Sequence, residues 1–496
     1  MSARGIVVML VLVSAGVARA AGPASQVVGL EVTYQEWDQR RPWAKRDPSR
    51  RNASAVVLAG PSLLTTAEMV GAATLVKIEK FGRSTQAVAH VAFVDPDVNL
   101  ALLSVDDPRF FDGLTPVTLA PATPMAEALR TIRWNDQQLE SAATRVKRVE
   151  VDASLQGSLE HVFLEVQTDL TGGGWSEPVF RGDQLVGLTV SQEDDQRARV
   201  IPVEVLSLFC RRARAPEYAR FPVLGAEWES NADPALAAFL GQAGEPSGII
   251  IRKVPWGGSA CGVLEPMDVL LAIDGVPIDA EGFYPHPHLG RLLFPHLLVE
   301  RHAAGDVVPV KVLRAGHVLD LRMTLRAYPS ALDLVPQSNN GGPPYAVVGG
   351  LVFRELDVPY LASWGSEWTE KAPAVLRLLH RLDQESQRPD RRRIVVLSSV
   401  LPSPYNVGYQ DIADAVVESV NERAVQSIGD LVGAFESPIG GFHTITLART
   451  ASRREIVLDA GGLSDATAGV LAAYGVPRAV RLPSGPLPDI PCASRQ

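Results

Sequence analysis

One glycine-rich stretch contains the residues whose types could perform acyl-transfer chemistry. Residues 168–190 pass through Gly172, Gly173 and Gly174 to Trp175 and Ser176, and two short apolar runs around a turn follow. This pattern predicts a tight loop that leads into a β-hairpin. Such a loop can present backbone N–H groups to an oxyanion beside a nucleophile, which acyl transfer requires. Ser176 is the serine in this stretch, and its hydroxyl could attack a carbonyl.

The order of these residues resembles the serine loop of the HtrA/Deg-type serine proteases, in which Thr-Asp leads to Gly-Asn-Ser-Gly-Gly-Pro. Counting back from Pro178, the family's nucleophilic serine falls on Trp175, and Ser176 lies one position too late. The loop between Asp169 and Pro178 is also two residues shorter than the family's loop. The resemblance therefore implies that the chain keeps the frame of a protease and lacks its nucleophile.

Two further segments resemble the same family and depart from it at the decisive residue. Residues 54–70 resemble the segment that carries the general-base histidine, and Glu68 stands at that position. Residues 94–105 resemble the segment that carries the orienting aspartate, and Asn99 stands there. The triad needs a base of near-neutral pKa and a carboxylate that stabilises its cation. The resemblance thus implies a degenerate triad of Glu68, Asn99 and Trp175, with no catalytic residue.

Ser176 is the fallback nucleophile, and it would need a base. His90 and His161 lie on predicted strands without a motif around them, so we interpret them as structural histidines. A pairing of Glu68 with Ser176 is chemically conceivable only if burial raises the pKa of the carboxyl. For Trp175 we favour simple core filling over a ligand role.

Short alternating apolar runs separated by turn residues predict an all-β fold for residues 26–213. The family resemblance narrows this prediction to the double β-barrel of a degenerate trypsin-like protease domain. Over the whole chain we expect a mostly β fold with some helices, in which the barrels are followed by two PDZ domains.

Residues 214–330 resemble a PDZ domain, with Met267 where the signature has its glycine and a turn at Asp274 and Gly275. PDZ domains bind an extended peptide by strand addition and capture its terminal carboxylate with backbone N–H groups. The resemblance assigns that capture to four consecutive residues, Val223, Leu224, Gly225 and Ala226. His296, on the helix beside the groove, could contact a ligand side chain, although an exposed helix histidine is the simpler interpretation.

After a linker at residues 331–344, residues 345–462 repeat the PDZ order more weakly. Gly349, Gly350 and Leu351 resemble a second carboxylate loop that enters a strand. The region resembles the atypical C-terminal PDZ domain of the plant Deg branch and its bacterial relatives, where that domain serves mainly assembly. We expect residues 463–496 to form a flexible tail with one helix.

Composition and charge limit the partners and cofactors. The 496 residues carry a formal charge of −9, so nucleic acid is not an expected partner. His286, His288, His296 and His302 do not have the spacing of a zinc site, and we expect neither a metal nor a cofactor. A bridge between Cys210 and Cys261 is conceivable, but we favour two buried thiols and a separate tail cysteine, Cys492.

The N-terminus has the layout of a cleaved secretory signal, with one positive charge, a short apolar core and an Ala-x-Ala site. Residues 1–20 are therefore the expected signal peptide, and the periplasm is the expected location. No later stretch predicts a membrane span, so we expect no stable membrane insertion after cleavage.

These patterns together predict an exported pseudoprotease that binds peptide segments or C-termini of envelope proteins, or unfolded proteins, as a chaperone or adaptor. One alternative is an active serine endopeptidase that uses Ser176. The other is a regulatory or structural subunit that assembles with an active relative. The resemblance implies a homo-oligomer, a trimer or a multiple of it, and Trp43 and Trp175 could serve the contact.

Overall fold

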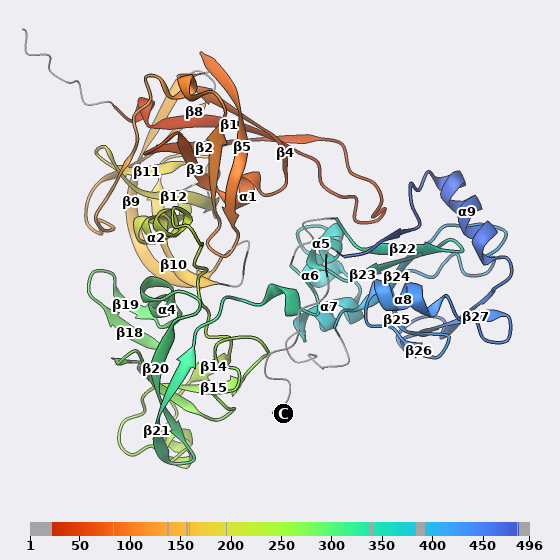
Figure 1. The fold of residues 1–496 in the computed structure, drawn as a ribbon. Helices are drawn as coiled ribbons and strands as arrows, with labels where there is room; N and C mark the ends of the chain where they lie inside the picture. The colour runs from red at the N-terminus through yellow and green to blue at the C-terminus, as the bar shows by residue number, and fades with distance from the viewer. Residues whose placement is uncertain are drawn as a thin grey trace, which may run out of the picture.

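We describe the protein from a computed structural model. It describes residues 22–485 apart from residues 83, 136, 137, 155, 156, 158, 195, 338–341, 383–391 and 484. The predicted signal peptide and Cys492 therefore lie outside the described residues. Figure 1 shows three parts, which we call the first, second and third unit in chain order.

The first unit contains a closed barrel with the strand order β1-β2-β3-β6-β5-β4. The elements of this barrel are β1 (Val27–Tyr34), β2 (Ser49–Leu58), β3 (Ser62–Thr66), α1 (Ala67–Val70), β4 (Ala73–Lys80), β5 (Thr85–Asp95) and β6 (Leu100–Val105). Alternating side chains of β1, from Val28 to Val32, are buried inside it, as the period of two in a strand requires. The short helix α1 leaves β3 directly and carries Glu68.

A seven-stranded sheet with the order β11-β8-β9-β10-β13-β12-β7 completes the first unit. Because β11 also pairs with β12, the sheet closes on itself over most of its strands. Its strands are β7 (Thr118–Leu119), β8 (Leu129–Asn135), β9 (Gln138–Ala153), β10 (Glu160–Thr168), β11 (Pro178–Arg181), β12 (Gln184–Gln192) and β13 (Arg197–Pro202), and α2 (Val203–Ala213) follows. The glycine-rich loop joins β10 to β11.

The second unit is built on the sheet β14-β15-β16-β20-β21, with β17 attached to β16. Its elements are β14 (Glu227–Ser230), α3 (Pro234–Phe239), β15 (Ile249–Lys253), β16 (Val269–Ile273), β17 (Val276–Pro277), β18 (Phe283–His286), β19 (Gly290–Leu293), α4 (Pro295–Arg301), β20 (Val307–Arg314) and β21 (His317–Thr324). The helix α4 packs against β10 of the first unit, so these two units share a buried contact.

The third unit is an eight-stranded sheet with the order β28-β27-β25-β24-β23-β22-β29, and β26 pairs with β25. Its strands are β22 (Tyr345–Val348), β23 (Leu351–Glu355), β24 (Val395–Val400), β25 (Ala415–Val420), β26 (Arg423–Ala424), β27 (Phe442–Leu447), β28 (Glu455–Asp459) and β29 (Val480–Arg481). Its helices are α5 (Val358–Leu361), α6 (Trp368–Lys371), α7 (Ala374–Arg381), α8 (Ile428–Ala434) and α9 (Leu463–Tyr474).

Two expectations require correction. Residues 463–481 are not part of a flexible tail, because α9 packs on β22 and β29 pairs with β22. The favoured pair of buried thiols is also wrong. Cys210 is a free buried thiol, whereas Cys261 takes part in a disulfide. The conceivable bridge between these two cysteines is therefore absent. In the described part of the chain, every helix is too short or too polar to cross a membrane.

Candidate functional site

The two positions that the resemblance assigns to the base and the carboxylate lie next to each other. The backbone N–H of Glu68 donates to Oδ1 of Asn99 over 2.9 Å. Burial raises the pKa of the Glu68 carboxyl to about 7. Oε1 of Glu68 and Nδ2 of Asn99 are buried and have no hydrogen-bond partner among the described residues. The site thus combines a carboxyl that titrates near neutral pH with an uncharged amide, which cannot stabilise a cationic base.

Ser176 is buried and already bonded. Its hydroxyl oxygen accepts hydrogen bonds from the backbone N–H of Thr66 and from Oγ1 of Thr65, each over 3.1 Å. The residue has a φ of 66° and an exposed fraction of 0%. All nine histidines of the chain lie in the described part, and none of them is a hydrogen-bond partner of Ser176. The hydroxyl therefore faces the strand β3 and lacks a base.

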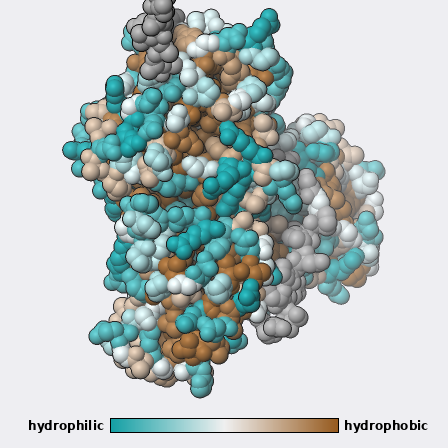
Figure 2. All heavy atoms as spheres, turned by 60° about the vertical axis from the view of Figure 1, so that its left-hand side comes forward, coloured by the Kyte–Doolittle hydropathy of each residue, from teal (hydrophilic) through white to brown (hydrophobic). Residues whose placement is uncertain are grey.

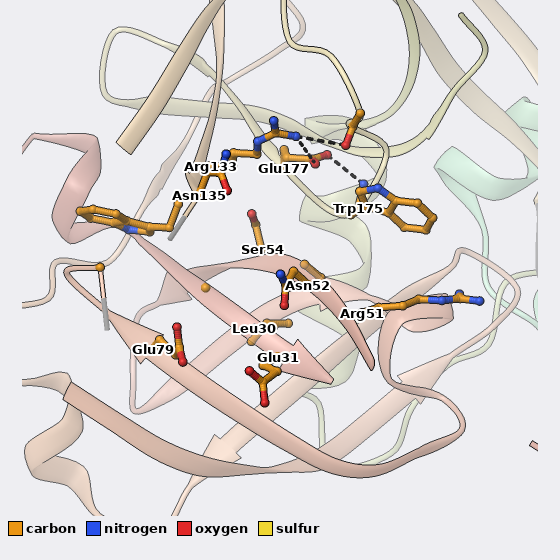
Figure 3. A pocket seen from close by; sticks show the side chains of 15 residues that line it. Leu30, Glu31, Arg51, Asn52, Ser54, Glu79, Arg133, Asn135, Trp175 and Glu177 are labelled. Carbon is orange, nitrogen blue, oxygen red and sulfur yellow. Dashed lines mark hydrogen bonds and ion pairs between the residues drawn. The ribbon is translucent and has the colours of Figure 1, made fainter. Parts of the chain in front are cut away.

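Trp175 does not fill the core, contrary to our expectation. Its side chain is 41% exposed, and the Arg51 guanidinium carbon lies 5.8 Å from the centre of its ring. The carbonyl of Trp175 accepts from the N–H of Ser54 over 3.0 Å, which ties the glycine-rich loop to the first barrel. Figure 3 shows Trp175 and Arg51 on the same side of a cavity of about 390 Å³ between the two sheets of the first unit.

The backbone amides of the glycine-rich loop are occupied by side chains of the same chain. Oε2 of Glu177, a residue that is 2% exposed, accepts from the N–H groups of Gly174 and Trp175, each over 2.9 Å. The N–H of Gly173 donates to the side-chain oxygen of Gln192. Figure 3 shows the Glu177 carboxylate beside Trp175, with Arg133 on its other side at 3.9 Å. An anion-binding loop is therefore present, and an internal carboxylate fills it.

The motif comparison did not identify Glu177 and Gln192, although a signal for the first was present. The family pattern has glycine immediately before its proline, and Glu177 stands there in this chain. A carboxylate at that position is close enough to cap the preceding amides. Gln192 lies 19 residues beyond Gly173, on β12, and no local pattern indicates its role.

The predicted carboxylate loop of the second unit has open amides. The carbonyl of Leu224 accepts from Ala260 over 2.9 Å, but the N–H groups of Leu224 and Gly225 have no hydrogen-bond partner among the described residues. Gly225 has a φ of 68°, and a Cβ there would lie 2.5 Å from Cα of Gly258. Only glycine fits this close approach at a positive φ, so the conformation of the loop depends on Gly225.

A cavity of about 250 Å³ adjoins this loop. Aromatic side chains from β14 and from the start of α4, Trp228 and Phe294, form part of its wall. Leu159 and Glu160 of the first unit close it on another side. Figure 2 shows apolar surface on the lower half of the molecule, at the height of the second unit. An apolar cavity with open backbone donors at one end suits an extended peptide end.

His296 is not an exposed helix residue, which corrects the simpler interpretation. It is 0% exposed, and burial, followed by the nearby His161 and His286, lowers its pKa to about 3. Both of its ring nitrogens lack hydrogen-bond partners among the described residues. The first unit covers this helix face, so His296 supports the contact between units and does not line the cavity. No group of three or more His, Cys, Asp or Glu residues suited to a metal ion occurs in the described ranges.

The structure places Gly349 and Gly350 in the two-residue turn between β22 and β23, with φ angles of 58° and 92°. These are the values of a type I′ hairpin turn. The N–H of Gly349 donates to Oγ1 of Thr467 on α9 over 2.9 Å, and Leu351 is fully buried. The described geometry therefore gives no support to a carboxylate site at these three residues.

Comparisons with known proteins agree with the motifs. A PDZ-domain family model matches residues 335–481. A chloroplastic protease Do-like 2 of Arabidopsis thaliana is 28% identical over 82% of this chain, and the match spans 67% of that protein. A putative mitochondrial protease Do-like 3 of the same plant is 25% identical over 89% of this chain and 76% of its own length. Among solved structures, an HtrA-type protease AlgW with a decapeptide has a TM-score of 0.47 at 19% identity and covers 62% of this chain and 96% of its own.

The protein is thus a mostly β chain with a PDZ domain near its C-terminus. It is a homologue of the Do-like serine proteases, plant members of that group included, and the predicted resemblance is confirmed. The PDZ match falls on the third unit, whose copy of the pattern was the weaker of the two in the sequence.

Proposed function

We propose that this protein is a non-catalytic, peptide-binding relative of the Do-like proteases that acts on envelope proteins as a chaperone or adaptor. The observation that carries the proposal is the Glu177 carboxylate, which accepts from the amides of Gly174 and Trp175. A site for acyl transfer needs such amides free for the oxyanion that develops on the substrate. A negative charge fixed at that position opposes the same oxyanion.

The missing nucleophile and base support the proposal. A serine protease needs an accessible hydroxyl with a base within about 2.6–3.2 Å. Ser176 is 0% exposed, and its oxygen accepts two hydrogen bonds from β3. Trp175, at the family position of the nucleophile, has no nucleophilic atom.

Peptide binding is assigned to the second unit. The open amides of Leu224 and Gly225 suit a terminal carboxylate, and Val223 and Ala226 flank them. The cavity walls of Trp228 and Phe294 suit apolar side chains. Fluorescently labelled peptides with a free C-terminus should bind to the full chain, whereas the same peptides with an amidated C-terminus should bind much more weakly. Equal binding of both forms would contradict carboxylate capture.

One test distinguishes an inactive from an active catalytic site. The purified mature chain and its Ser176→Ala variant are treated with a serine-directed fluorophosphonate and, separately, with casein. We expect neither labelling nor cleavage from either protein. Labelling of the parent chain that disappears in the variant would overturn the proposal.

The rival function is an endopeptidase that pairs Ser176 with Glu68, and one observation favours it. The Glu68 carboxyl has its pKa raised to about 7, a range suited to general acid–base catalysis. Any such activity should rise with pH around 7 and disappear in Glu68→Gln. A cleavage activity that survives this substitution excludes the pairing.

Export, assembly and the domain division are also part of the proposal. The leader pattern of residues 1–20 supports export to a periplasm, and the sheets support divisions near residues 213 and 330. A homo-oligomer, a trimer or a multiple of it, is part of the proposal, and the remaining alternative role is a regulatory or structural subunit that assembles with an active relative. Co-purification with an active protease from the native host would support the subunit role. Light scattering of the purified chain measures whether it forms a homo-oligomer.

A further inference from the structure

The connection between β1 and β2 extends far from the first barrel. We call residues 36–46 of this connection the arm. Figure 1 shows the arm reaching from the first unit to the third, near α5 and β22. It is a small hairpin, because the backbone N–H of Asp38 donates to the carbonyl of Ala44 over 3.0 Å and that of Arg46 donates to the carbonyl of Glu36 over 2.9 Å. The arm therefore presents a preformed shape to whatever it contacts.

Two arginines of the third unit donate hydrogen bonds to backbone carbonyl groups of the arm. Nη1 of Arg354 donates to the carbonyl of Gln39 over 2.7 Å, and Nη1 of Arg481 donates to that of Pro42 over 2.9 Å. Arg354 is fully buried and is paired with Asp357 at 2.8 Å. Hydrogen bonds from charged donors in a buried contact are among the stronger ones in proteins. These bonds help to fix the position of the arm.

Four side chains of the arm also contact the third unit, and the first is Gln39, whose Oε1 accepts from Nη2 of Arg354 over 3.2 Å. The guanidinium carbon of Arg481 lies 3.9 Å from the centre of the Trp37 ring, and that of Arg40 lies 3.9 Å from the centre of the Trp364 ring. The ring of Trp43 packs 6.1 Å from that of Tyr345. Cations stacked over aromatic rings add attraction to such a contact.

Charge and shape on the third unit complement the arm. Asp414 lies 3.4 Å from Nη1 of Arg40. Gly342 approaches Trp37 so closely that a Cβ there would lie 2.6 Å from the indole ring. The surface of Arg354, Arg481, Tyr345, Trp364 and Asp414 thus contacts both the backbone and the side chains of one short segment.

We propose that this surface is the peptide-binding site of the third unit, and that its ligand is the arm. The ligand class is a hairpin-forming peptide with two tryptophans around an arginine, and the same chain supplies it. The proposal is independent of the second-unit loop and of catalysis. It gives the C-terminal PDZ domain a role in fixing its own position relative to the first barrel.

The test uses the full chain with Trp37→Ala and Trp43→Ala combined. These substitutions leave the Arg354–Asp357 pair intact, so the third unit keeps its own buried contacts. Arg46→Ala is the matched control, because its exposed side chain has no contact with the third unit among the described residues. Hydrogen exchange is measured in the arm and in β22, and small-angle scattering measures the dimensions of the chain.

We expect the double variant to lose exchange protection in both segments and to expand, while the control matches the parent. A labelled synthetic peptide of residues 35–47 should bind the double variant at least about tenfold more tightly than the parent, whose site is already filled. A mass above one chain that falls in the double variant would place the arm of a second copy on the same surface. Unchanged exchange and scattering, or equal peptide binding by both proteins, would overturn the proposal.

Discussion

The glycine-rich loop of the first unit and the loop at residues 223–226 both contain glycine at positive φ but differ in their occupant. In the first, Glu177 accepts from the amides of Gly174 and Trp175. In the second, the amides of Leu224 and Gly225 have no partner among the described residues and adjoin a cavity. Successive backbone N–H groups can hold an anion where they converge, as those of Gly174 and Trp175 do on Glu177. The side chain that occupies the first loop, rather than the backbone conformation, therefore makes the amides of this loop unavailable to an oxyanion.

The two loops also differ in the role of the carboxylate that lies nearby. The Glu177 side chain is 2% exposed and accepts from the loop amides and from Oγ1 of Thr189, so its carboxylate is part of the folded structure. The cavity beside residues 223–226 has a different polar wall, formed in part by Glu160. A ligand carboxylate would enter the second loop as Glu177 enters the first.

Removing the internal carboxylate should have the largest effect. Glu177→Ala leaves the amides of Gly174 and Trp175 without their buried acceptor, and we expect a loss of about 2–4 kcal/mol in unfolding free energy. Urea denaturation measures it. Glu193→Ala, an exposed carboxylate 3.7 Å from Arg197, serves as the control and should cost less than about 0.5 kcal/mol. A loss as small as the control's would show that the loop does not need its anion.

Low pH should destabilise the part of the first unit that lies against the second unit and forms one wall of the cavity at residues 223–226. Burial lowers the pKa of His161 to about 4 and that of His296 to about 3. Arg199 and Asp152 face His161, whereas His286 and His161 face His296, and Glu300 lies on the same helix.

The direction follows from proton linkage. Below a pH of about 6.5 the unfolded histidines take up protons that the folded ones exclude, so stability is complete above that pH and falls as the pH drops toward about 4. Each histidine contributes about 1.4 kcal/mol per pH unit in this window. Thermal unfolding from pH 7 to pH 4 measures the slope. His296→Leu should flatten it, whereas the exposed His317→Gln should not; equal slopes in all three proteins would contradict the linkage.

A side chain at Gly225 should weaken capture at the loop of residues 223–226. In Gly225→Ala the new Cβ lies 2.5 Å from Cα of Gly258 at a φ of 68°. We expect peptide affinity to fall at least about tenfold, or about 1.4 kcal/mol. Gly275→Ala carries a similar φ of 74° with nothing within 4 Å, so it controls for backbone strain alone. Fluorescence anisotropy with a free C-terminal peptide compares the two, and equal losses would remove the loop from the site.

The motifs predicted the backbone frame better than its contacts. They placed Glu68 and Asn99 together, and the two are hydrogen bonded, because strand order and short connections follow from local patterns. They could not show that Gln192 reaches Gly173, since a single side chain from a distant strand decides that contact. His296 was misjudged for a similar reason. A helix pattern does not reveal that another unit covers its outer face.

Substitution of Glu160 should have the smallest effect on peptide binding at residues 223–226. Glu160 lines the cavity, and burial, with the charge of Asp152 as a second cause, raises the pKa of its carboxyl above the ordinary range. When ionised it repels a ligand carboxylate, so peptide affinity in the parent should increase as the pH falls from 7.5 toward 5, where the ligand terminus stays charged. Glu160→Gln should bind about two- to fivefold more tightly at pH 7.5, on the scale of a single partly screened charge pair. It should also lose most of the pH dependence. Titrations of both proteins at several pH values check this, and parallel pH profiles would place Glu160 outside the reach of the ligand carboxylate.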